Sequence, residues 1–173
     1  NKQVENVLKI SQLDRNKISL IKNPYNIHDV LDEASKRISL LLKSKNGKIV
    51  LNYGADKSTF PLSFEDITNV FINILENSIK YSTNNPEISV KTYNLNDKLY
   101  INFKDNGMGI SNKLKSKIFD KFFRVSKGNI HNVKGHGLGL SFVKKIIDLH
   151  NGTISVNSEL GKGSQFIISF NLK

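Results

Sequence analysis

The sequence predicts an α+β fold, an α/β sandwich in which helices pack against a mixed sheet. Segments with helical periodicity and segments with strand alternation are interleaved along the 173 residues, which is typical of this class. Two pairs of alternating segments, 87–94 with 98–105 and 152–158 with 164–172, are each joined by a short turn and predict hairpins. The hydrophobic fraction of 38% is enough for one ordinary globular core.

The N-terminal part predicts two helices and two strands. Residues 2–14 carry apolar side chains at helical spacing, and a short strand is expected at Ile18–Ile21. Asn26 is the expected N-cap of a helix that runs to Leu42, and Gly47 leads into a further short strand. The expected apolar face of this second helix comprises Val30, Leu31, Ala34, Ile38 and Leu41.

A strong helix is predicted over residues 63–82, with Ser63 as its cap and Asp66 completing an acidic variant of the capping box. Its expected core residues are Ile67, Val70, Phe71, Ile74 and Leu75. A polar stripe of Asn69, Asn73, Asn77 and Lys80 follows the opposite side. This stripe is either a solvated face with a Glu76–Lys80 ion pair, or a set of amide oxygens for Mg²⁺ beside a lysine for a phosphate.

The stretch 107–134 is rich in Gly, Lys and Asn, with short helical pieces expected near 112–118 and 119–123. Connections of this length are usually functional lids or disordered. A last helix is expected directly after it, with Leu140, Val143, Ile146, Ile147 and Leu149 as its apolar residues.

Two glycine motifs flank this stretch. In the first, Asp105 ends a strand and is followed by Gly107 and Gly109; this is either an ordinary turn or a carboxylate that accepts the amino proton of an adenine. In the second, Gly135, Gly137 and Gly139 lead into a helix, which favours either a simple helix start or an anion held by free backbone N–H groups.

The composition excludes several classes of protein. Without cysteine there are no disulfides and no thiolate chemistry, and no apolar run approaches the roughly 18 residues of a membrane span. The net charge of +11 is spread along the chain without a run of five basic residues, which favours solvated faces over a nucleic-acid surface. The first residue is not Met and no signal peptide follows, so we expect a fragment of a longer protein.

Five motifs occur in a specific order: "NILENSIKYS", "DNGMGI", "IFDKFFRV", "GHGLGLS" and "GKGSQF". Together they resemble the N, G1, F, G2 and last glycine boxes of the ATP-binding catalytic domain of sensor histidine kinases, in the family shared with gyrase, Hsp90 and MutL. The resemblance covers residues 17–173. It implies a Bergerat-type fold, with a largely antiparallel sheet of about five strands, helices on one face and a lid at about 107–136. It also implies that residues 1–16 end the second helix of a dimerisation hairpin.

The resemblance also assigns roles to residues. It implies a Mg²⁺ ligand at Asn77, a nucleotide contact at Asn73, and phosphate contacts at Lys80 and Arg124. It implies an adenine site formed by Tyr81, Asp105, Gly107, Gly109, Ile110 and Ser164. It implies phosphate contacts from the loop that comprises Gly135, Gly137, Leu138, Gly139 and Leu140. Phe119, Phe122 and Phe123 would anchor the lid or simply pack in the core. Ser78 and His136 depart from the family, which usually has Ala at the first position and Thr or Ser at the second.

One position favours phosphoryl transfer over hydrolysis. Gyrase-like members carry a Glu as the base for water where this chain has Asn73, whose amide cannot accept a proton at pH 7. A neutral imidazole needs no such base. We therefore expect a protein-histidine kinase that uses ATP and Mg²⁺, with its phosphoacceptor histidine upstream of Asn1; a catalytically silent nucleotide-binding module is the alternative. The implied partners are the protein's own hairpin in a homodimer and a response-regulator receiver domain, without nucleic acid, in the cytoplasmic part of a membrane-anchored sensor.

Overall fold

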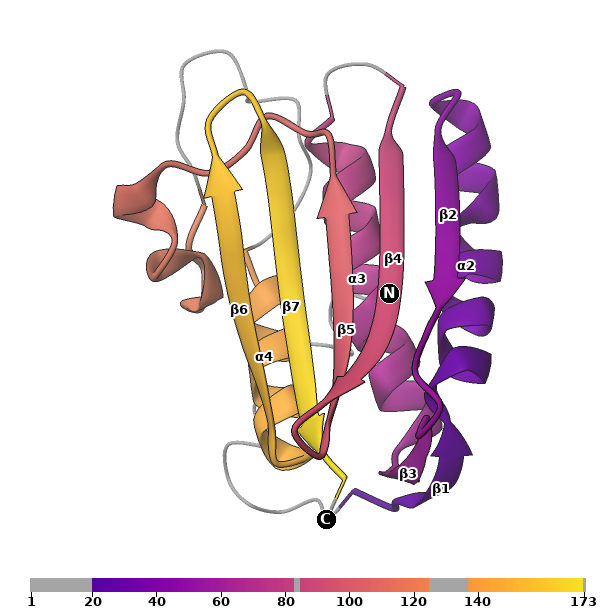
Figure 1. Ribbon diagram of the computed structural model, residues 1–173. Coiled ribbons are helices and arrows are strands. Elements are labelled where there is room, and N and C mark those ends of the chain that lie inside the picture. The colour runs from indigo at the N-terminus through magenta and orange to yellow at the C-terminus, as the bar shows by residue number, and fades with distance from the viewer. Residues whose placement is uncertain (1–19, 83–84, 125–136, 173) are drawn as a thin grey trace.

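Five strands form one mixed sheet in the computed structural model, which describes residues 20–82, 85–124 and 137–172 (Figure 1). The strand order is β2-β4-β5-β7-β6. The strands are β2 (Lys48–Tyr53), β4 (Glu87–Leu95), β5 (Lys98–Asp105), β6 (Gly152–Glu159) and β7 (Gly163–Asn171). Only the β2–β4 pair is parallel among these neighbours, so the predicted mixed, largely antiparallel sheet is confirmed.

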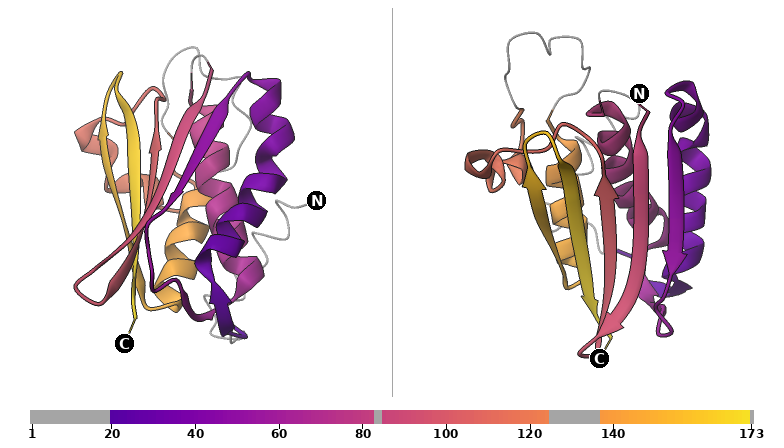
Figure 2. Two further views of the ribbon diagram at one scale, coloured as in Figure 1. Left: turned by 45° about the vertical axis from the view of Figure 1, so that its right-hand side comes forward. Right: turned by 45° about the horizontal axis from the view of Figure 1, so that its top comes forward.

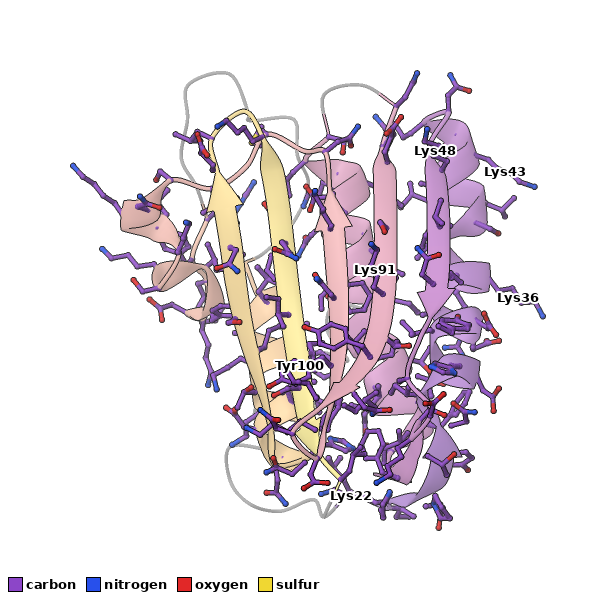
Figure 3. The ribbon with its side chains drawn as sticks, in the orientation of Figure 1. Lys22, Lys36, Lys43, Lys48, Lys91 and Tyr100 are labelled. Carbon is purple, nitrogen blue, oxygen red and sulfur yellow. The ribbon has the colours of Figure 1, made fainter. Side chains whose placement is uncertain are left out.

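Helices of the described residues cover one face of this sheet (Figure 2). They are α2 (Ile27–Ser44), α3 (Phe64–Lys80) and α4 (Gly139–Leu149). Lys91 and Tyr100 project from the opposite, open face (Figure 3). The alternation along β5 follows from this two-layer arrangement, because Leu99, Ile101 and Phe103 are buried and point to the helices.

The predicted apolar side of α3 forms the centre of the core. All five residues expected there are buried, and the Phe71 ring lies 5.3 Å from the ring of Phe103 on β5. The polar stripe of the same helix is only partly buried. Since the apolar side is fixed against the sheet, the stripe must face the space between α3 and the segments around α4.

The start of α2 is confirmed, and the end of its apolar face is corrected. The Asn26 side chain accepts a hydrogen bond of 2.9 Å from the His28 backbone N–H, as an N-cap does. Leu41, however, is 42% exposed, whereas Leu42 is buried. The buried positions Ala34, Ile38 and Leu42 are four residues apart and therefore lie on one face of the helix. Leu41 lies beside this face and is not covered by the core.

Strands β1 (Asn23–Asn26) and β3 (Thr59–Leu62) form a two-stranded antiparallel sheet after the strand expected at Ile18–Ile21, of which residues 18 and 19 lie outside the described residues. Residues 20–22 are not in a strand, and Ile21 is 80% exposed. The apolar alternation was misleading because pairing requires a partner, and β3 lies beside Asn23–Asn26 instead. β3 itself was not predicted.

The cap of α3 lies at Ser63 as predicted, but the capping box is wrong. The Ser63 hydroxyl donates to the Asp66 carboxylate at 2.7 Å rather than accepting from the helix backbone. The Ser63 backbone N–H, which Asp66 was expected to bind, instead donates to His150 Nε2 at 3.0 Å. The Ser63 N–H is therefore bound by a residue distant in sequence, His150, rather than by the third residue of its own helix.

Residues 107–124 form a small lobe beside α4, with two single 3₁₀ turns, η1 (Asn112–Leu114) and η2 (Lys117–Phe119), in place of the expected helical pieces 112–118 and 119–123. The described part of this stretch reaches to residue 124. The rest of the expected lid with Gly135 and His136, the expected helix 2–14 and the hairpin end 1–16 lie outside the described residues.

The buried His150 side chain is held as a neutral imidazole by its two hydrogen bonds. Its Nε2 accepts the Ser63 N–H, so Nδ1 carries the proton and donates to the Ile146 carbonyl at 2.8 Å. Burial lowers the pKa of this imidazole below its usual 6.5, and the nearby Lys22 lowers it further, against the opposing effects of the Ile146 bond and Asp66. The folded state therefore binds a proton less readily than the unfolded state.

We expect the free energy of unfolding to fall as the pH drops below about 6.5, by at most about 1.4 kcal/mol for each pH unit. Urea unfolding at pH 7.5, 6.5 and 5.5 measures this slope. His150→Gln retains a donor and an acceptor but does not titrate, so its slope should be shallower. An identical slope in the two proteins would show that another group is responsible.

Candidate functional site

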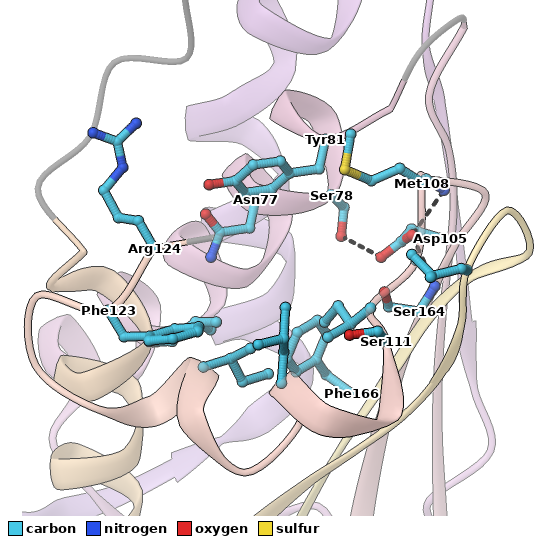
Figure 4. A pocket seen from close by; sticks show the side chains of 17 residues that line it. Asn77, Ser78, Tyr81, Asp105, Met108, Ser111, Phe123, Arg124, Ser164 and Phe166 are labelled. Atoms are coloured by element: carbon cyan, nitrogen blue, oxygen red, sulfur yellow. Dashed lines mark hydrogen bonds between the residues drawn. The ribbon is translucent and has the colours of Figure 1, made fainter. Parts of the chain in front are cut away.

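A pocket opens where α3, the end of β5, the lobe 107–124 and the β6–β7 turn meet (Figure 4). Its lining comprises Asn77, Ser78, Tyr81, Asp105, Gly107, Met108, Gly109, Ile110, Ser111, Leu114, Ile118, Phe123, Arg124, Leu140, Leu160, Ser164 and Phe166. Tyr81 and Met108 lie on one side, and Phe123 and Phe166 lie on the other (Figure 4). An apolar slot with a few polar groups at one end suits a flat, partly polar ring.

Asp105 supplies the polar end of this slot. Its Oδ1 accepts hydrogen bonds from the backbone N–H groups of Gly107 at 2.8 Å and Ser164 at 3.1 Å. Burial raises the pKa of this carboxyl above its usual range, and the bonds from Gly107, Ser164 and Ser78 oppose that rise. With Oδ1 occupied, Oδ2 is the oxygen that remains available to a donor on a ligand.

Ser78 is a pocket residue that the sequence did not identify as part of the site. Its hydroxyl is buried and lies 3.2 Å from both Asp105 Oδ2 and the Ile74 carbonyl (Figure 4). It departs from the family's usual Ala, and its place next to Asn77 on the helix was the available signal. The hydroxyl gives the pocket a second polar group beside the carboxylate.

The hydroxyl of Ser164 is oriented by a chain of hydrogen bonds. Ser158 Oγ accepts from the Ile110 N–H at 2.8 Å and donates its single proton to the Gly163 carbonyl at 2.8 Å. The 2.9 Å contact between the two hydroxyls must therefore be a donation from Ser164 to Ser158. Ser164 Oγ consequently faces the pocket as an acceptor.

Two cations lie at the other end of the pocket. The Lys80 ammonium is 5.4 Å from the centre of the Tyr81 ring, and Arg124 contributes to the lining. Burial lowers the pKa of Lys80 from its usual range, and Arg124 lowers it further, while Glu76 acts in the opposite direction. Burial and the nearby guanidinium both disfavour the charged form of the lysine. An anion bound between the two cations would offset their mutual repulsion.

The first turn of α4 lies beside these cations. The helix begins at Gly139 without a side-chain cap, and Leu140 reaches the pocket. The Asn73 side chain is adjacent, because a Cβ on Gly139 would lie 2.8 Å from Asn73 Oδ1. The Asn73 amide nitrogen donates back to the Asn69 carbonyl at 2.7 Å. The first N–H groups of α4 have no partner within the helix, and they favour an anion.

Most of the residues predicted for the site are brought together. The pocket lining contains Asn77, Tyr81, Asp105, Gly107, Gly109, Ile110, Arg124, Leu140 and Ser164. The lining does not include Asn73, Lys80, Gly137, Leu138 and Gly139, and Gly135 lies outside the described residues. The sequence did not identify Ser78, Met108, Ser111, Leu114, Ile118, Leu160 and Phe166.

The three phenylalanines expected to anchor the lid or pack in the core differ in their burial. Phe119 and Phe123 pack against the core, but Phe122 is 69% exposed with a φ of 62°. The hydrogen bond of 3.0 Å from the Phe122 N–H to the Gly137 carbonyl accompanies this conformation.

The pocket offers a magnesium ion one amide oxygen, so a bound phosphate would have to supply further oxygen ligands. No cluster of three His, Cys, Asp or Glu side chains that could hold a metal occurs in residues 20–82, 85–124 and 137–172. The Asn77 side chain has no hydrogen-bond partner within these same ranges and lines the pocket. One amide oxygen beside a phosphate site is what Mg²⁺ accepts, since it usually takes few protein ligands and completes its shell with phosphates and water.

The chain belongs to the family of histidine kinase-, DNA gyrase B- and HSP90-like ATPases, whose profile matches residues 64–173. It is 42% identical over 98% of its length to the sensor protein RprX of Bacteroides fragilis, covering 33% of that protein. It is 35% identical over 98% of its length to the signal transduction histidine-protein kinase ArlS of Staphylococcus aureus, covering 37% of it. The domain is thus a histidine kinase-type ATPase catalytic domain, and the chain spans about a third of the length of these relatives.

Solved structures agree on the fold. The chain superposes on full-length ShkA in complex with AMPPNP with a TM-score of 0.84 at 21% identity, covering 98% of this chain and 35% of that one. For the catalytic domain of the histidine kinase ThkA, the TM-score is 0.72 at 25% identity, with 87% of this chain and 95% of that one covered. None of the helices in the described ranges is long and apolar enough to cross a membrane.

Proposed function

We propose that this domain binds ATP with Mg²⁺ and transfers the γ-phosphoryl group to a histidine side chain on an upstream dimerisation helix. The observation that carries the proposal is the division of one pocket into two chemically distinct ends. A buried carboxylate and two hydroxyls line one end; Arg124 and Leu140, from the first turn of α4, line the other, where the Lys80 ammonium lies over the ring of Tyr81. Among common metabolites, a nucleoside triphosphate has this polarity.

The adenine ring would enter the apolar slot between Tyr81 and Phe123. Its amino group would donate to Asp105 Oδ2, the oxygen that the two backbone donors leave available. Ser164 Oγ, as an acceptor, would hold a water molecule or an amino proton beside it. Ile110 would pack on the base, and Gly107 and Gly109 would let the backbone approach it.

The phosphates would lie between α3 and the first turn of α4. Lys80, Arg124 and the N–H groups of Leu138–Leu140 would balance their charge. Asn77 would hold Mg²⁺ through its amide oxygen, and the ion would neutralise charge on the phosphate oxygens. Asn73 would contact the nucleotide from the same helix face.

The transfer breaks the bond between the γ-phosphorus and the β,γ-bridging oxygen and forms a bond from the γ-phosphorus to an imidazole nitrogen, releasing ADP. Positioning and charge balance carry most of such a reaction, and these residues supply both. The Asn73 amide, bonded back to Asn69, cannot take a proton from water, so transfer is favoured over hydrolysis.

The acceptor histidine and the partners would come from outside this chain. The described histidines His28 and His150 are packed into the fold, away from the pocket. The hairpin that ends near residue 16 would present the acceptor within a homodimer of the membrane-anchored sensor. A receiver domain would then take the phosphoryl group; ThkA, which this fold resembles, has been solved in complex with the response regulator TrrA.

The proposal is tested by adding the chain to a hairpin fragment of its parent protein with ATP labelled at the γ-phosphate. Acid-labile label on the hairpin supports it. A chain that binds ATP but labels no hairpin would instead be a silent nucleotide-binding module of the same family.

The role of Asn77 gives a separate prediction. Asn77→Ala should weaken binding of Mg·ATP about tenfold or more but leave ATP binding in EDTA unchanged, because only the metal contact is lost. Calorimetry with and without Mg²⁺ measures both values. Asn69→Ala is the matched control, since Asn69 lies on the same stripe but outside the pocket. If EDTA lowered the ATP affinity of Asn77→Ala and of the unmodified protein by the same factor, Asn77 would not be a ligand of the metal.

A further inference from the structure

The segment Leu20–Asn26, here called the strap, is bound to the end of a helix far along the chain. The Lys22 ammonium donates a 2.6 Å hydrogen bond to the carbonyl of Leu149, the last residue of α4 and 127 positions away. The contact is partly buried. A cation at this place satisfies one of the unpaired carbonyls at the helix end and interacts favourably with the helix dipole.

Lys22 supplies what α4 itself lacks. The last turns of α2 and α3 each contain a lysine, Lys43 and Lys80, whereas the last turn of α4 contains no basic residue. Lys144 is on the same helix, but its ammonium is 2.5 Å from an oxygen of Asp148 on the helix surface. The strap therefore provides the C-terminal cation of α4.

The strap is also tied to the beginning of α3. Its residues 23–26 form β1 and pair with β3, which leads directly into α3. The ring of Tyr25 packs edge-on against Phe64, the first residue of α3, with 5.2 Å between the ring centres. His150 closes the cluster, because it accepts the Ser63 N–H and bonds Ile146 of α4. Lys22 lies at this end of the molecule, with β1 and β3 (Figures 1 and 3).

The opposite ends of the same two helices form the phosphate end of the pocket. Asn77 and Lys80 lie in the last turn of α3, and Leu140 lies in the first turn of α4. A helix of 11 residues is about 16 Å long and behaves as a short rod. A tilt at the strap end of α4 is therefore passed to its first N–H groups.

We propose that Lys22 is a positioning residue for the phosphates of the nucleotide. By holding the end of α4 against the strap and the start of α3, it sets where the first turn of α4 lies relative to Asn77 and Lys80. The inference rests on the proposed nucleotide binding.

The experiment separates the phosphate end of the pocket from the base end. Lys22→Met retains the aliphatic stem but removes the charge and the donor. It should raise the Kd for Mg·ATP about threefold to tenfold. The Kd for adenosine should not change, because Asp105, which would bind the base, lies on β5 and does not depend on the position of α4. Calorimetry measures ATP, and NMR shifts of pocket amides measure adenosine. Lys22→Arg, which keeps a cationic donor, should bind ATP as the unmodified protein does. Lys144→Met, the surface control on α4, should also leave ATP binding unchanged.

Three results would contradict the proposal. Unchanged ATP affinity in Lys22→Met would mean that the contact does not position the phosphate site. An equal loss of ATP and adenosine affinity, with a lower melting temperature, would mean a general loss of structure. Failure of the unmodified chain to bind any ATP would overturn the proposed function and this inference with it, whereas normal ATP binding with an unaffected Lys22→Met overturns this inference alone.

Discussion

Asp105→Asn is expected to weaken ATP binding about 100-fold and to remove the preference for ATP over inosine triphosphate. The substitution replaces the oxygen facing the adenine amino group with an NH₂ group, so two donors would meet. Inosine triphosphate carries a carbonyl oxygen where adenine has its amino group, and it would meet the new donor favourably. The expected result is thus a change of base preference rather than a general loss of affinity.

The surrounding hydrogen bonds should accept the amide without loss of the fold. The amide oxygen can take the place of Oδ1 and accept from Gly107 and Ser164. The NH₂ group would then lie near Ser78, whose hydroxyl can donate to the Ile74 carbonyl at 3.2 Å and accept from the amide. Few buried carboxylates could be replaced by an amide so simply.

Calorimetric titration of both nucleotides, with the melting temperature as a check of folding, measures this prediction. Asp120→Asn provides the control, because Asp120 is an exposed carboxylate of the lobe that does not line the pocket. If Asp105→Asn bound ATP normally and still discriminated against inosine triphosphate, the base would be read by another group and the assignment of Asp105 would be wrong.

Periodicity accounts for the parts of the fold that could be predicted. The apolar stripe of α3 and the alternation of β5 each repeat over several turns or residue pairs, so local pattern and tertiary burial agree. The strands β1 and β3 have only four residues each, too few for a repeating pattern to stand out, and each contains a proline; they are stabilised by pairing with one another. Only the tertiary structure could reveal them.

The site shows the same division. Asp105 and Asn77 could be identified because their neighbours in sequence, a glycine pair and a helical stripe, are part of the motif. Lys22 could not, because its partner is 127 positions away, and for Ser78, whose partner Asp105 is 27 positions away, the available signal was its place next to Asn77. The exposure of Phe122 was likewise hidden, since its positive φ accompanies a hydrogen bond with Gly137 rather than any property of phenylalanine.

The largest expected effect on stability comes from Gly163→Ala at the start of β7, directly after the β6–β7 turn. Gly163 has a φ of 89°, and a Cβ there would lie 2.0 Å from the Asp105 carbonyl oxygen. Because that atom belongs to the backbone of the neighbouring strand β5, the two strands must separate locally. The bond of 3.1 Å from the Ser164 N–H to Asp105 Oδ1 would be lost with them.

Gly161→Ala isolates the steric part of this effect. Gly161 lies two residues earlier, in the β6–β7 turn itself, with a φ of 80°, but a Cβ there would meet nothing within 4 Å. It should therefore lose only the conformational term of about 1–2 kcal/mol. Gly163→Ala adds the backbone clash and the lost hydrogen bond, so the expected loss is about 3–5 kcal/mol.

Urea unfolding of the two variants compares these losses directly. Nucleotide binding should follow the same order, since Gly163→Ala displaces Asp105 while Gly161→Ala leaves it in place. Equal losses of stability in the two variants would mean that the turn moves freely away from β5. In that case the close approach of Gly163 to the strand would not be what holds the Asp105 carboxylate in the pocket.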